Sequence, residues 1–142
     1  MGASAFAYCV SLAEISEEKI ETIGTQGFYG CVSLKELNLA AIRTIGDYAF
    51  LQALTLKNVT IGSAVEKIGK NAFAYANAEG EEGTVLTVTF LGTDVPEFGE
   101  EIFKEVAALE IVVADEATKT AFAAALEAYA EYIVVASAAA AA

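Results

Sequence analysis

The stretch Ile45-Gly46-Asp47-Tyr48-Ala49-Phe50 recurs further along the chain as Ile68-Gly69-Lys70-Asn71-Ala72-Phe73. A related stretch, Ile23-Gly24-Thr25-Gln26-Gly27-Phe28, precedes both at nearly the same spacing. Weaker copies over 2–6 and 99–103 extend the series, so that phenylalanines fall at positions 6, 28, 50, 73 and 103. A period of about 20–50 residues indicates a repeat protein, in which units too short to enclose a core stack on their neighbours.

The rest of each unit follows the same plan. A small or apolar residue stands three places after each phenylalanine: Cys9, Cys31, Ala53, Ala76 and Val106. The alternation over Leu34–Leu39 and Leu56–Ile61 predicts a short β-strand with every second side chain directed inward. The Ala-Phe pair fits a helical or 3-10 turn, and the glycine suits close approach of a neighbouring coil. We therefore expect a solenoid of about five coils of 22–23 residues over 1–114.

The remaining segments depart from the repeat. The acidic, glycine-containing insertion Asn77–Gly83 predicts a projecting loop in the fourth unit. Over 115–134 the apolar residues Phe122, Leu126, Tyr129 and Ile133 are spaced 4, 3 and 4 apart, which predicts an α-helix that begins near Asp115 or Thr118. We expect this helix to cap the solenoid. An alanine-rich tail fills 135–142, and side chains that had not been identified would give the same composition.

Composition excludes several classes of protein. Eight Lys and Arg stand against 20 Asp and Glu, a net charge of −12, which argues against binding to nucleic acid or to anionic lipid. The absence of histidine removes His-based nucleophilic dyads and metal sites. No signal peptide and no run of about 20 apolar residues is apparent. With 56% of its residues apolar, the chain can bury a substantial core, and a disordered chain would not carry so much.

No constellation of residues predicts catalysis, a cofactor or a metal. Cys9 and Cys31 occupy one repeat position that elsewhere holds alanine, so we interpret them as small buried residues rather than as a disulfide or a reactive pair. A second set lacks the ordered ligand spacing of a calcium loop, and we interpret it as solvated acids: Glu79, Glu81, Glu82 and Asp94. Glycoside hydrolysis needs paired carboxylates in a cleft, whereas a solenoid offers a shallow face. We therefore expect no enzymatic activity.

These repeats resemble the BspA-like, or Treponema pallidum type, leucine-rich repeats. That family repeats an Ile-Gly-x-x-Ala-Phe-x-x-Cys core, followed by a strand, at a period within the range of leucine-rich repeats. The match is clearest at Ile45–Phe50, at Ile68–Phe73 and across Phe28–Leu34, and it covers roughly 2–133. The resemblance implies a leucine-rich-repeat solenoid of the α/β class, with a short strand and a helical or 3-10 turn in each coil. It also implies a bacterial surface or extracellular setting, adhesion to proteins, and no catalysis by the repeat.

Two functional hypotheses follow. The first is a non-catalytic protein-binding or adhesion module whose partner contacts outward residues of the strand face: Lys35, Asn38, Lys57, Asn58, Thr60, Thr87 and Thr89. The second is a structural protein that self-assembles into oligomers or filaments. Its first coil begins in mid-unit with nothing upstream to cover it, so its apolar positions would form the contact: Phe6, Cys9, Leu12 and Ile15. Both predict a protein partner.

Overall fold

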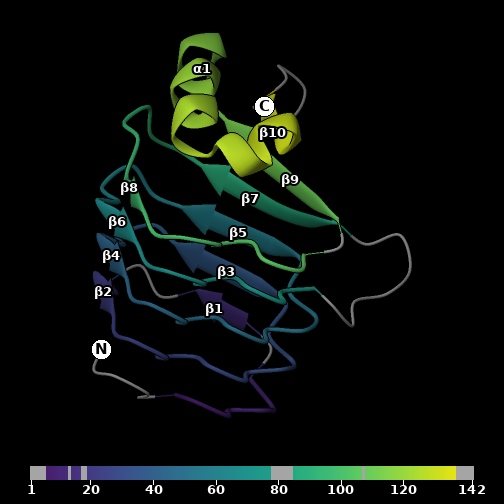
Figure 1. The fold of residues 1–142 in the computed structure, drawn as a ribbon. Helices are drawn as coiled ribbons and strands as arrows, with labels where there is room; N and C mark the ends of the chain where they lie inside the picture. The colour runs from purple at the N-terminus through teal and green to yellow at the C-terminus, as the bar shows by residue number, and fades with distance from the viewer. Residues whose placement is uncertain (1–5, 13, 17–18, 78–84, 107, 137–142) are drawn as a thin grey trace.

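The computed structural model describes residues 6–12, 14–16, 19–77, 85–106 and 108–136. Nine of the β-strands in the described residues form two parallel rows along the chain, and a tenth follows a C-terminal helix (Figure 1). The larger sheet has six strands in the order β1 (Glu14–Ser16), β3 (Glu36–Leu39), β5 (Asn58–Ile61), β7 (Leu86–Phe90), β9 (Leu109–Val113) and β10 (Ile133–Val135). The smaller sheet has four strands in the order β2 (Thr22–Ile23), β4 (Thr44–Ile45), β6 (Lys67–Ile68) and β8 (Glu97–Phe98).

All neighbouring strands are parallel, and their register follows the sequence repeat. Leu37 of β3 faces Ile15 of β1 on one side and Val59 of β5 on the other, so that equivalent positions of successive repeats lie opposite each other. The step along the chain from Val59 to Val88 in β7 is longer because the insertion expected over 77–83 falls between them. Residues 78–84, which include most of that insertion, lie outside the described part of the chain.

The core lies between the two sheets and the turns. Alternate residues of the strands are buried, as Leu37 and Leu39 are in β3 and Val59 and Ile61 are in β5. The rings of Phe6, Phe28, Phe50, Phe73 and Phe103 form a continuous stack, with centroids 5.2–5.8 Å apart and planes inclined by 4–15°. The sequence prediction that Phe28, Phe50 and Phe73 are buried and stacked in register is confirmed.

The turns that carry these phenylalanines differ from the helical or 3-10 turn that we expected. In the described copies they are consecutive hydrogen-bonded turns, because alternate amides have different partners. The Tyr29 amide donates within its own unit to the Gln26 carbonyl at 3.1 Å, whereas the Phe28 amide donates to Ala49 in the next unit at 2.8 Å. Residues two places either side of the ring, such as Gln26 and Gly30, have positive φ, which prevents a continuous helix.

The repeated glycine permits this close stacking. A Cβ at Gly46 would lie 2.6 Å from the Gly24 carbonyl carbon and 2.6 Å from the Thr25 amide nitrogen of the preceding unit. Equivalent clashes with the backbone arise at Gly69 and Gly99. The glycine of the Ile-Gly signature is therefore required by the approach of one backbone to the next.

The C-terminal segment is shorter as a helix than we expected. The α-helix α1 spans Glu116–Ala125, a 3-10 helix η1 spans Glu127–Tyr132, and the chain then enters β10. The expected helix over 115–134 stops early because Ile133–Val135 are β-branched and complete a ladder on β9, with Ile133 opposite Ile111. Asp115 caps α1 as expected, since its side chain accepts from the Thr118 amide at 2.8 Å.

The two helical segments attach to the core through aromatic contacts. Phe122 of α1 packs edge-on against Phe90 at 4.9 Å and Phe98 at 5.9 Å between ring centroids. Tyr129 of η1 packs perpendicular to Phe103, with centroids 5.3 Å apart. Within the described residues, no helix has the length and apolar character needed to cross a membrane.

Replacement of Phe50 by alanine should lower the free energy of unfolding by about 3–5 kcal/mol, because the ring is fully buried and stacks on both faces. Chemical denaturation followed by circular dichroism measures this loss. The matched control is Phe6→Ala, since Phe6 is 41% exposed and has a ring on only one face. A loss for Phe50→Ala no larger than that for Phe6→Ala would contradict the stacked core.

Candidate functional site

The outward side of the six-stranded sheet carries two rows of side chains, called here the strand face. One row runs across the strands at Glu36, Asn58, Thr87 and Glu110. The other runs at Asn38, Thr60, Thr89, Val112 and Val134. All nine side chains are exposed or half-buried, while their strand neighbours point into the core. The second row changes from polar at β3 to apolar at β10.

The structure brings together five of the seven residues that we expected on this face. Asn38, Asn58, Thr60, Thr87 and Thr89 lie in the two rows. Lys35 and Lys57 are exposed, but each precedes its strand by one residue. Their equivalents in later strands, Leu86 and Leu109, are buried, so the two lysines lie at the margin of the strand face.

Polar contacts on the strand face are few. The Asn58 side-chain amide donates to the Glu36 carboxylate at 3.1 Å across β5 and β3. Among the described residues, no group of three or more Cys, Asp and Glu side chains could hold a metal ion. The face offers hydrogen-bonding groups and exposed carboxylates to solvent.

The N-terminal end of the molecule differs in its hydrogen bonding. Amides of the first unit donate forward: that of Phe6 to Gly27 at 2.8 Å, and that of Tyr8 to Tyr29 at 2.6 Å. The same direction holds at Phe28, Phe50 and Phe73, whose amides reach the following unit. The Ala7 carbonyl is the repeat equivalent of the Tyr29 carbonyl. No backbone amide of the described residues donates to it. In its turns this end therefore presents carbonyl acceptors, whereas the strand segments run the other way, since the Gly46 amide donates back to Ile23 at 2.8 Å.

The residues expected to form a self-association contact are only partly assembled at that end. Phe6 is exposed on one face, and Cys9 and Leu12 are half-buried against the core. The backbone of Ile15 in β1 pairs with that of Leu37 in β3. The Ile15 side chain lies outside the described part. Tyr8, at 66% exposure, is the most exposed large aromatic residue of this end and was not in the expected set.

The opposite end is closed by Tyr129. Among the described residues, no later turn receives the Phe103 amide, which donates instead to the Tyr129 hydroxyl at 3.3 Å. Partial burial raises the pKa of Tyr129 above its ordinary value, so the phenol stays protonated at neutral pH. The sequence predicts Tyr129 on an apolar helix face but does not predict this role for its hydroxyl. The signal available was a tyrosine, rather than phenylalanine, at a core-facing position.

Cys9 and Cys31 are both free thiols. Cys31 is buried, its Sγ lies 3.1 Å from the Phe6 carbonyl oxygen, and burial raises the pKa of its thiol. A protonated, buried thiol is a poor nucleophile. This arrangement agrees with the interpretation of Cys31 as a small core residue, while Cys9 is half-buried beside it.

A family model described as a BspA type leucine rich repeat region, in six copies, matches residues 1–128. No curated protein matches the chain. The matched range contains β1 to β9 and α1, and hence most of the strand face and the N-terminal end.

Replacement of Tyr129 by phenylalanine should lower the free energy of unfolding by about 1 kcal/mol, because the Phe103 amide loses its acceptor while the ring packing is kept. Tyr132→Phe is the matched control, since the Tyr132 side chain is exposed. Amide exchange at Phe103 should accelerate in the first variant alone. Equal effects of both changes would show that the hydroxyl does not close this end.

Proposed function

This chain belongs to the BspA-type leucine rich repeat family, and on that premise we propose that it is a non-catalytic protein-binding module that engages its partner through the strand face. Repeats of this kind form protein-interaction modules, which supports the class of function. The observation that carries the proposal is the pair of outward rows, one across β3 to β9 and the other across β3 to β10, which no described element covers.

The finer parts of the proposal rest on the same support. The strand register, in which equivalent positions of successive repeats lie opposite each other, supports a solenoid with one coil per repeat. The C-terminal end of that solenoid is closed by α1, η1 and Tyr129. Family resemblance supports adhesion at a bacterial cell surface or in the extracellular space as the setting. Partners are then proteins of a host or of neighbouring cells, and the net charge of −12 disfavours nucleic acid.

Self-association is a second candidate, and the exposed ring of Phe6 favours it. The direction of the hydrogen bonds limits its geometry. Two copies that met through the turns of their N-terminal ends would oppose carbonyl to carbonyl, and α1 with η1 lies over the opposite end. A second copy would therefore dock through side chains such as Phe6 and Leu12 and would form a closed dimer more readily than a filament.

The strand-face proposal predicts that Thr60→Arg abolishes capture of a protein partner, because a long charged side chain would stand in the centre of the face. Pull-downs against extracellular-matrix and bacterial surface proteins supply the partner. Thr120→Arg makes the same change on the exposed surface of α1 and should leave capture intact. Equal capture by wild type and Thr60→Arg, or no capture by folded wild type, would contradict the proposal.

The self-association proposal predicts a dimer in analytical ultracentrifugation at about 0.15 M salt, where the repulsion between acidic chains is largely screened. Phe6→Ser should shift the equilibrium to monomer. Tyr75→Ser is the matched control, because Tyr75 is an aromatic residue of the same exposure, 40% against 41%, elsewhere on the molecule. A wild-type monomer at high concentration, with slow amide exchange over 6–12, would exclude this candidate.

A further inference from the structure

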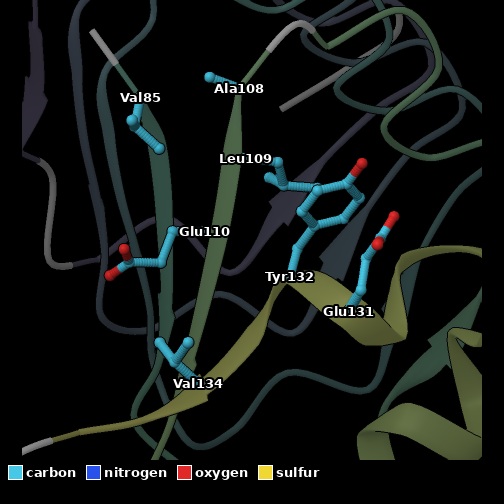
Figure 2. A pocket seen from close by; sticks show the side chains of 7 residues that line it. All are labelled: Val85, Ala108, Leu109, Glu110, Glu131, Tyr132 and Val134. Atoms are coloured by element: carbon cyan, nitrogen blue, oxygen red, sulfur yellow. The ribbon is translucent and has the colours of Figure 1, made fainter. Parts of the chain in front are cut away.

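The strand face ends in a hollow of about 370 Å³ beside β9 and β10 (Figure 2). Three apolar side chains that line it are exposed: Val85, Tyr132 and Val134. Val85 precedes β7 by one residue and Tyr132 precedes β10 by one residue, so different elements supply them. Single exposed apolar residues are common on protein surfaces, but several around one hollow indicate a contact surface.

A second hollow of about 550 Å³ lies on the same face. Its lining includes Thr87 and Thr89 of β7, Val112 of β9, and Leu91, which is 56% exposed. Glu110 lines both hollows, so a carboxylate stands where the two apolar regions meet.

The charges around Glu110 are not balanced by the chain itself. The ion pairs within the described residues join Arg43 to Glu66 and Lys104 to Glu101. Glu131 lines the first hollow and accepts a hydrogen bond from Tyr132, which raises the pKa of the tyrosine. The hollow therefore contains two carboxylates and no cation among its lining residues. A net charge of −12 adds a field that attracts cationic partners.

Resting on the proposed function, we infer that this end of the strand face binds an extended polypeptide segment with a lysine or arginine flanked, two residues away on each side, by aliphatic side chains. In an extended segment, residues i−2, i and i+2 point to the same side, about 7 Å apart. The cation then meets Glu110, and the two aliphatic side chains enter the two hollows. Thr87 and Thr89 border the second hollow and offer hydroxyls to the backbone of the segment.

Other occupants fit less well. Phosphate groups and anionic lipid headgroups would be repelled by Glu110 and Glu131. A purely apolar segment would leave the Glu110 carboxylate without a counter-charge at the centre of the contact, which costs desolvation energy. A basic segment with flanking aliphatic residues matches both the charge and the apolar lining.

The test is a titration of ¹⁵N-labelled protein with the peptide Gly-Leu-Ser-Lys-Ser-Leu-Gly, blocked at both ends. Amide shifts should change at Glu110, Tyr132 and Val134. Glu110→Gln should weaken binding about 1.4- to fivefold, the range expected for loss of one exposed ion pair. Val134→Ser should also weaken binding. Glu36→Gln is the matched control, because it removes an exposed carboxylate from the same row without touching either hollow.

Two further peptides separate the outcomes. Replacement of Lys by Glu, or of both Leu by Ser, should abolish binding, because each removes one half of the match. The inference would be overturned if the peptide with both Leu replaced by Ser bound as strongly as the original. It would also be overturned if Glu36→Gln weakened binding as much as Glu110→Gln. Either result would indicate general charge attraction. Shifts confined to Asn38, Asn58 and Thr60 would overturn it while leaving the strand-face proposal standing. The absence of amide shift changes with every peptide would also overturn the inference. The pull-down would then test the strand-face proposal separately.

Discussion

Every second amide of each turn donates to a carbonyl of the next unit, and the other features of the structure depend on this directional ladder. The amides of Phe28, Phe50 and Phe73 all donate toward the C-terminus, at 2.8–2.9 Å. Together with bonds of the opposite direction, such as that from the Gly46 amide to Ile23 at 2.8 Å, these bonds hold adjacent backbones so close that a Cβ at Gly46 would collide with the unit before it. The same spacing sets the 5.2–5.8 Å interval of the phenylalanine stack. Close packing of the rings and satisfaction of the amides therefore require each other.

The direction of the ladder makes the two ends of the molecule unlike. In the turns, the N-terminal end presents carbonyl acceptors and the C-terminal end presents amide donors, of which that of Phe103 is met by the Tyr129 hydroxyl. The strand segments run the other way, as the Gly46 amide donates to Ile23. The inner strands of both sheets are paired on both sides, while β1, β10, β2 and β8 are edge strands. On the broad surface of the larger sheet, only side chains are available for recognition. This leaves the strand face, with its polar residues toward β3 and its apolar, acidic hollows toward β10, as the broad surface for a partner.

Much of this architecture could be predicted from the sequence because the same residue pattern occurs in several successive repeats. The positions of Phe28, Phe50 and Phe73, and the alternation in β3 and β5, follow directly from it. The turn geometry could not be predicted, because positive φ at Gln26 or Tyr48 leaves no mark in those residue types. The fate of Ile133 was also ambiguous, since a buried residue at helical spacing can equally serve a strand when an unpaired neighbour such as β9 is present. The hollows at Glu110 depend on three segments distant in sequence, which no local pattern reports.

The most direct test of this account is detection of scalar couplings across hydrogen bonds by NMR in ¹³C,¹⁵N-labelled protein. The account predicts correlations from the amide nitrogens of Phe28, Phe50 and Phe73 to the carbonyl carbons of Ala49, Ala72 and Ile102 in the following units. Correlations from those amides to carbonyls three or four residues earlier would instead indicate helical turns. That result would contradict the directional ladder.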